Sequence, residues 1–161
     1  MLASEVCGMG FRFGYLTPLQ RKYWSLRNSG LTQADISREM DVTRQTVNKA
    51  FNAIDSRVSK AMLEAAQVNK VQISRVDPVK GFLLGHSPML GMDVLITFSE
   101  RNGIQLWYRG EGGCSECIQL SSCRQKLLIE AEDRGIPLPE KAEKMEPSKL
   151  SEILFKKIIE E

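Results

Sequence analysis

The chain has 161 residues, 42% of them hydrophobic and 26% charged, which is enough for one medium domain or two small domains with a modest core. No apolar run approaches the roughly 18 residues that span a bilayer, and residues 1–8 lack the basic flank and apolar stretch of a secretory signal. We therefore expect no membrane association and a cytoplasmic location. The net charge of +2 is too small by itself to indicate a nucleic-acid partner.

The positive charge is nevertheless concentrated near the N-terminus. Residues 1–65 carry nine Lys and Arg against six Asp and Glu, whereas the rest of the chain is close to balanced. Within residues 43–60, a single acid, Asp55, stands against four cations: Arg44, Lys49, Arg57 and Lys60. This local excess favours a phosphate-binding surface, because neutralised phosphates supply much of the affinity for DNA.

The first half of the chain predicts an arm followed by three helices. Residues 1–15 hold several glycines, three aromatic residues and Cys7, and we expect them to form an ordered arm. The helices are predicted at residues 18–29, 33–40 and 44–66. Each follows a threonine that can cap it, and these caps are Thr17, Thr32 and Thr43. Gly30 is expected to end the first helix.

The second half of the chain predicts a small antiparallel sheet and two further helices. Short apolar and alternating segments predict strands at residues 71–76, 80–86, 93–98 and 104–108. Asn102 and Gly103 predict a tight hairpin turn, because both residue types accept positive φ. The remaining helices are predicted at residues 124–134 and 148–160.

Residues 31–51 have the pattern of two helices packed at a corner. Apolar side chains fall where such a corner must bury them, at Leu31, Ile36, Met40, Val42, Val47 and Phe51. Ala34 is small enough for the helices to approach closely. The opposite face at the start of the third helix is polar and basic, which predicts a helix-turn-helix.

The segment from Leu16 to Val47 resembles the helix-turn-helix shared by LuxR-type regulators, region 4 of sigma factors and the archaeal Tfx-type regulators. The resemblance covers about a quarter of the chain. Two positions depart from the pattern. Gln20 stands where LuxR-type proteins usually carry glutamate, and Asp41 stands in the turn where glycine is common, although aspartate tolerates left-handed backbone better than most residues.

This resemblance implies that the start of the third helix enters the major groove of duplex DNA. The residues expected to contact DNA there are Thr43, Arg44, Gln45, Asn48 and Lys49, which can bond base edges or phosphates. Thr32 and Gln33 are expected phosphate contacts at the start of the second helix. The alternative is that these helices pack against another helical domain and expose their polar face to solvent.

The four cysteines form the second notable feature of the sequence. They are Cys7, Cys114, Cys117 and Cys123, of which the last three follow the spacing C-x2-C-x5-C. In a cytosolic protein, clustered cysteines are more often metal ligands or redox groups than structural disulfides. Four thiolates suit tetrahedral zinc or an iron–sulfur cluster. The same residues are also compatible with a metal-free dithiol switch or with ordinary unreactive thiols.

The cysteine spacing is similar to that of the fumarate–nitrate reduction regulators, which sense oxygen through a [4Fe–4S] cluster. The similarity covers the spacing alone, and the surrounding sequence is unlike theirs. It implies a [4Fe–4S] cluster held by all four cysteines, with zinc as the alternative. His86, the only histidine, could replace Cys7 as a ligand, but a lone loop histidine is more often bonded to the backbone.

The predicted fold class is α+β, with an arm and helix-turn-helix domain at residues 1–66 and a small α+β domain at residues 67–161. The second domain is expected to serve in sensing and dimerisation, with an antiparallel sheet and a cysteine-ligated metal site. The apolar stripe of residues 148–160 is wide enough for self-association, although packing within its own domain is equally reasonable. A homodimer is expected because helix-turn-helix proteins usually pair across symmetric half-sites.

These features predict a sequence-specific transcription regulator that senses redox state or oxygen. Its expected partners are duplex DNA, a second copy of the chain and the transcription machinery. One alternative is a constitutive DNA-binding regulator with a structural zinc, and another is an iron–sulfur redox protein that does not bind DNA. No set of residues suited to catalysis stands out, so we do not expect an enzyme.

Overall fold

The computed structural model describes residues 15–110 and 113–160, which form an α+β fold with one four-stranded antiparallel sheet. In chain order the elements are α2 (Pro18–Asn28), α3 (Gln33–Glu39), α4 (Arg44–Val68), β1 (Gln72–Asp77), β2 (Phe82–Ser87), β3 (Met92–Ser99), β4 (Gly103–Arg109), α5 (Leu120–Asp133), the 3-10 helix η2 (Ala142–Lys144) and α6 (Pro147–Glu160). The strands pair in sequence order, so each strand lies beside the next one along the chain.

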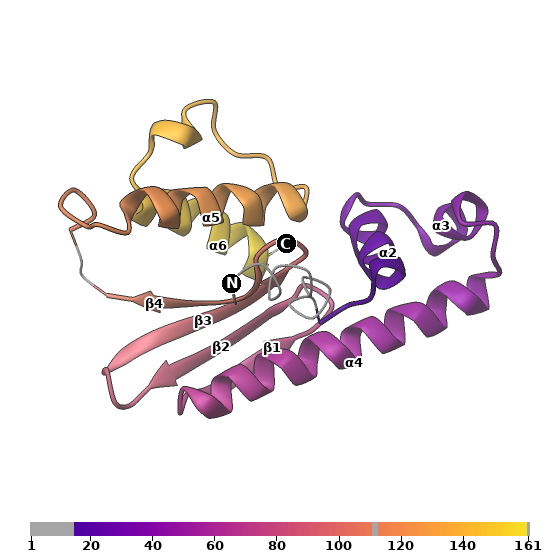
Figure 1. Cartoon of the computed structure of the whole chain (residues 1–161), viewed down its shortest axis with the longest axis horizontal. Helices are drawn as coiled ribbons and strands as arrows, with labels where there is room; N and C mark the ends of the chain where they lie inside the picture. Colours follow the sequence, from indigo (N-terminus) through magenta and orange to yellow (C-terminus); the bar gives the residue numbers. More distant parts are fainter. Residues whose placement is uncertain (1–14, 111–112, 161) are drawn as a thin grey trace, which may run out of the picture.

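Helices cover both faces of the sheet (Figure 1). The C-terminal half of α4 packs on one face, while α5 and α6 pack on the other. Neighbouring residues of one strand therefore enter different cores: Leu83 faces α4, and Phe82 faces the α5–α6 layer. Double coverage explains why β3 is buried continuously from Val94 to Ser99 instead of alternating between buried and exposed residues.

One hydrophobic core joins the N-terminal helices to the sheet. It includes Ile36 of α3, Val47 of α4 and Phe98 of β3, and it therefore runs across the predicted boundary between residues 66 and 67. At its centre the ring of Trp24 meets Phe98 edge to face, with 5.1 Å between centroids. Gly81 lies so close that an added Cβ would stand 2.8 Å from the Trp24 ring. The boundary itself remains a prediction.

Side-chain capping sets the starts of the first three described helices. Thr17, Thr32 and Thr43 each accept a hydrogen bond from the backbone N–H three residues later, as the sequence predicts. Gln20 also donates to the Thr17 hydroxyl through its backbone while its side chain accepts from the Thr17 N–H, which completes a capping box. Glutamine thus serves the capping role that glutamate commonly has at this position.

The hairpin predicted at Asn102 and Gly103 is confirmed, whereas the predicted start of α5 was wrong. Strands β3 and β4 pair on either side of a short turn, with three residues between Ser99 and its partner Gly103. Only Gly103 has positive φ, while the Asn102 side chain donates to the Lys126 carbonyl on α5. Helix α5 begins at Leu120, four residues before the predicted start, and no side chain caps it. The sequence therefore contains no capping residue that marks the start of this helix.

The apolar stripe of α6 is used inside the described chain. Leu150, Leu154 and Ile158 are all buried in the core between α6, α5 and the sheet. Acidic substitutions at Leu154 and Ile158 would therefore unfold this core and could not report on dimerisation. The expected homodimer therefore requires another surface.

Candidate nucleic-acid interface and cysteine segment

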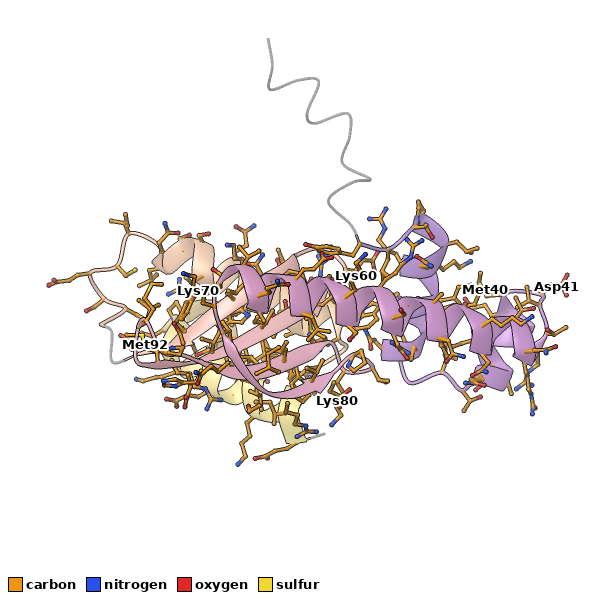
Figure 2. The ribbon with its side chains drawn as sticks, turned by 90° about the horizontal axis from the view of Figure 1, so that it is seen from below. Met40, Asp41, Lys60, Lys70, Lys80 and Met92 are labelled. Carbon is orange, nitrogen blue, oxygen red and sulfur yellow. The ribbon has the colours of Figure 1, made fainter. Side chains whose placement is uncertain are left out.

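Helices α3 and α4 meet at a corner that lies at one end of the molecule. The connection from Met40 to Thr43 turns through Asp41, whose φ is +51°. Aspartate is one of the few residues other than glycine that adopts this left-handed conformation readily, so it can occupy the turn without glycine. Figure 2 shows Met40 and Asp41 at this end, with Lys70 and Met92 toward the opposite end.

The first turns of α4 have one buried and one exposed face. Val47 is fully buried and Phe51 nearly so, and both anchor the helix against α2 and α3. The polar side chains predicted to contact DNA on the opposite face are all exposed: Arg44, Gln45, Asn48 and Lys49. Within the described part of the chain, none of these four side chains forms a hydrogen bond or an ion pair with another side chain. They are therefore available to a ligand in solution.

The three other predicted contact residues have a more mixed structural role. The hydroxyls of Thr32 and Thr43 are engaged in capping, at 3.2 Å from the Asp35 N–H and 3.1 Å from the Thr46 N–H. Gln33 is exposed in the first turn of α3. The structure thus places all seven predicted residues at the starts of α3 and α4, but it gives two of them an evident function in folding.

Asp35 takes part in the N-terminal cap of α3, and the same contacts favour its ionised carboxylate. Hydrogen bonds from the Thr32 hydroxyl and backbone, with the nearby Arg38 guanidinium, lower the pKa of Asp35 below its usual value. Because the folded state favours the ionised form, this carboxylate contributes stability above the pKa of the unfolded chain, and that stability is lost as pH falls through the folded pKa.

We therefore expect Asp35→Asn to lower the melting temperature slightly at neutral pH and to have a smaller effect in acid. Parent and variant are compared by thermal unfolding from pH 7 to pH 3. The interpretation requires the two melting temperatures to converge as pH falls below about 4. Glu39→Gln, on the exposed last turn of the same helix, is the matched control. A difference that is constant over this range would contradict the role of the Asp35 charge.

The cysteine segment follows β4 at the end of the sheet remote from α3 (Figure 1). The Cys117 N–H donates to the Cys114 carbonyl at 3.1 Å, which forms a turn, and Cys123 lies in the first turn of α5. Cys117 is exposed, whereas Cys114 and Cys123 are partly buried. Cys7, the predicted fourth ligand, lies outside the described residues.

The donor types of this segment fit a thiolate-bound metal, but their positions do not complete a site. Among residues 15–110 and 113–160, no three His, Cys, Asp or Glu side chains gather closely enough to hold a metal ion. The three described cysteines would need both a rearranged turn and Cys7 to form the predicted site. We therefore derive no step of the mechanism from a metal.

His86 has a different environment from the one predicted. It is not a loop residue bonded to backbone but lies in β2, where its Nδ1 is 2.9 Å from Oδ1 of Asp93 on β3. The two residues are direct partners across the hairpin. The sequence alone did not reveal this pair, because the pairing depends on the length of the turn between the strands.

The described helices include none with both the length and the apolar content needed to cross a bilayer. In comparisons with protein-family models, curated proteins and solved structures, no match to this chain was found.

Proposed function

We propose that this protein is a sequence-specific regulator of transcription that binds duplex DNA through the start of α4. The observation that carries the proposal is that the start of α4 has one exposed polar face and one buried apolar face. Arg44, Gln45 and Asn48 are exposed without side-chain partners among the described residues, while Val47 and Phe51 fix the helix from behind.

The proposed readers have the chemistry for base recognition. An arginine guanidinium can donate two hydrogen bonds to guanine, and an asparagine amide can both donate to and accept from adenine. Lys49 is a flexible point charge that suits phosphate. Because the helix is anchored by its apolar face, these groups would be presented to the groove with little loss of backbone freedom on binding.

The length of α4 suggests how DNA binding could be linked to the rest of the chain. Its 25 residues begin at the proposed reading surface and end at Val68, beyond the residues that pack on the sheet. A displacement of the sheet could therefore move the reading surface through one continuous helix. We propose separately that the cysteines, with their turn rearranged, are ligands of a [4Fe–4S] cluster or, alternatively, of zinc.

We expect Arg44→Ala and Asn48→Ala each to weaken binding to the preferred DNA site by about 1–3 kcal/mol and to relax base preference. Lys49→Ala should weaken binding to every sequence alike and reduce the dependence on salt, because it removes a phosphate contact. The preferred site is first selected from random duplexes, and affinities are then measured by fluorescence anisotropy at several salt concentrations.

Lys156→Ala is the matched control, because Lys156 is an exposed cation on α6, away from the α3–α4 corner. It should bind DNA like the parent. If Arg44→Ala, Asn48→Ala and Lys49→Ala all retain parental affinity and base preference, the proposed reading surface is wrong. If the parent selects no duplex sequence, the regulator proposal itself fails.

A further inference from the structure

A row of polar residues crosses all four strands on the side of the sheet that α5 and α6 cover elsewhere. Gln72 of β1 pairs with His86 of β2, His86 with Asp93 of β3, and Asp93 with Arg109 of β4. In the neighbouring row, Leu84, Leu95 and Trp107 contribute to the core beneath the two helices, and the exposed Arg75 is the β1 partner of Leu84. The polar row therefore lies where the helical layer ends.

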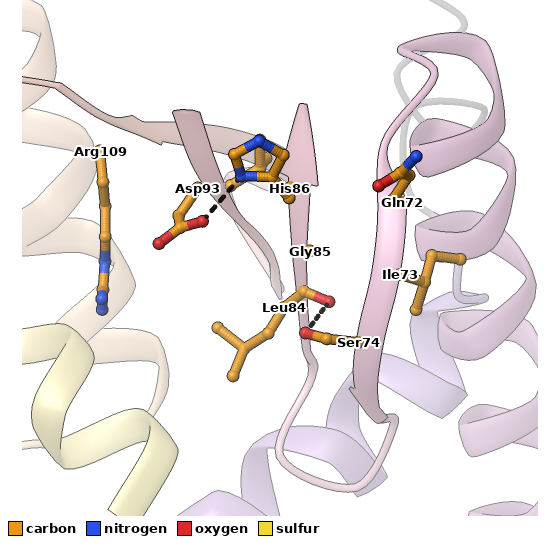
Figure 3. Close-up of a pocket in the computed structure, with 9 residues that line it drawn as sticks. Gln72, Ile73, Ser74, Leu84, Gly85, His86, Asp93 and Arg109 are labelled. Carbon is orange, nitrogen blue, oxygen red and sulfur yellow. Dashed lines mark hydrogen bonds and ion pairs between the residues drawn. The ribbon is translucent and has the colours of Figure 1, made fainter. Parts of the chain in front are cut away.

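This row lines a cavity of about 450 Å³, a volume suited to a small organic molecule. Figure 3 shows the cavity with His86, Asp93 and Arg109 on neighbouring strands. A bulge helps to shape its other side: Ile73 pairs with Gly85 and Arg75 with Leu84, which leaves Ser74 as an extra residue. The Ser74 hydroxyl donates to the Leu84 carbonyl at 3.0 Å and closes this edge of β1.

The charged groups of the cavity are arranged as a pair of opposite signs. The Asp93 side chain is 70% exposed and accepts from His86 on one side, while its strand partner on the other side is Arg109. Arg109 is exposed, and its guanidinium has no hydrogen-bond or ion-pair partner among the described residues. A cation-binding carboxylate thus stands beside an anion-binding guanidinium, at the spacing of directly paired strand residues, about 5 Å between Cβ atoms.

The remaining groups add selectivity for a ligand with a polar head and an apolar body. When the His86 ring is neutral, its hydrogen bond from Nδ1 to Asp93 leaves Nε2 as an acceptor. Leu84 supplies apolar lining at the centre of the cavity. A head group that carries both signs fits better than a simple anion, because Asp93 would repel the latter.

We propose that this cavity binds a small zwitterion, namely a free α-amino acid with an apolar side chain. Its carboxylate pairs with Arg109, its ammonium group pairs with Asp93, and its side chain lies against Leu84. The free protein binds this amino acid whether or not it also binds DNA. Any effect on operator affinity does rest on that proposal, since β1 begins only four residues after α4 ends.

The test compares ligands that differ by one charge. L-leucine, leucinamide and 4-methylpentanoate are titrated into uniformly 15N-labelled protein without DNA, and backbone amide shifts are followed by NMR. L-leucine should give saturable shifts at residues 72, 86, 93 and 109. Leucinamide lacks the carboxylate and 4-methylpentanoate lacks the ammonium group, so each should bind about tenfold or more weakly.

Variants then assign the two charges. Arg109→Gln and Asp93→Asn should each weaken L-leucine binding about tenfold or more, and both replacements are at exposed positions compatible with folding. Arg75→Gln is the matched control, because Arg75 lies on the same sheet outside the cavity lining and should bind like the parent. The amide spectrum of each variant verifies its fold.

Three outcomes would overturn the inference. The first is the absence of saturable shifts with L-leucine and the other apolar amino acids. The second is equal affinity for L-leucine and 4-methylpentanoate, which would show a plain anion site. The third is unchanged affinity in folded Arg109→Gln. Because DNA is absent, none of these outcomes can arise from failure of the proposed DNA-binding function.

Discussion

Replacing Arg134 with Met is expected to lower the free energy of unfolding by about 3–5 kcal/mol, because it leaves a buried carboxylate without its charged partner. The side chains of Arg134 and Glu130 are 6% and 0% exposed, and their closest atoms are 2.9 Å apart. Arg134 also donates to three backbone carbonyls, those of Lys80, Gly81 and Phe98. These bonds connect α5 to the turn before β2 and to the end of β3.

The other partners of Glu130 make the loss more severe. Its second carboxylate oxygen accepts from the Ser99 hydroxyl and from the Asn102 side chain, each at 3.0 Å. Removing Arg134 therefore disturbs a network that joins both hairpins at this end of the sheet to α5. Urea unfolding followed by circular dichroism measures the effect.

The double variant Arg134→Met, Glu130→Gln should recover part of the lost stability, because it removes both charges together. The matched control is Lys60→Met, since Lys60 and Glu64 form an ion pair of 3.9 Å whose members are largely exposed. That substitution should change stability by less than about 1 kcal/mol. A loss in Arg134→Met as small as that in the control would contradict the structural role of the buried pair.

Local signals predicted most of the secondary structure. Thr32 and Thr43 each have a side chain that can satisfy the free N–H groups at a helix start, so the beginnings of α3 and α4 follow from neighbouring residues. The four strands were likewise predicted within two residues at each end, because their apolar segments are separated by turn residues. Such signals act over a few positions and do not require knowledge of the tertiary fold.

Features that depend on distant parts of the chain were not predictable in the same way. Glu130 and Arg134 have the spacing of a helix-surface ion pair, and only the docking of α5 on the hairpins buries them. The polar row through His86 and Asp93 depends on strand register, which a change of one residue in a turn would alter. Sequence periodicity contains neither kind of information.

The same distinction applies to the candidate sites. The exposure of Arg44, Gln45, Asn48 and Lys49 could be predicted because they lie within the first turns of one helix, where sequence spacing determines which residues share a face. The predicted metal site could not be assembled in this way, since its ligands come from residue 7 and from residues 114–123, which are distant in sequence. Whether Cys7 joins the other three thiols is a question of long-range packing.

Chain length permits residues 7–15 to span the length of β4. Eight residue steps separate Cys7 from Tyr15, and an extended chain of that length spans at most about 28 Å. The ring of Tyr15 contacts Phe98, near the start of β4, whereas the cysteine segment follows the end of that strand. The seven residues of β4 extend over about 23 Å, which is within this reach.

Under the cluster proposal, Cys7→Ser should abolish iron binding and lower the melting temperature of protein purified without oxygen. A serine hydroxyl is a poor substitute for thiolate, and the metal would join two segments that are distant in sequence. The measurements are iron content, absorbance at about 400 nm and thermal unfolding. Cys114→Ser, Cys117→Ser and Cys123→Ser should each lose the same absorbance, whereas Ser115→Ala, within the same turn, should retain it. Full iron content in Cys7→Ser would remove Cys7 from the ligand set, and stoichiometric zinc in the parent would replace the cluster with the zinc alternative.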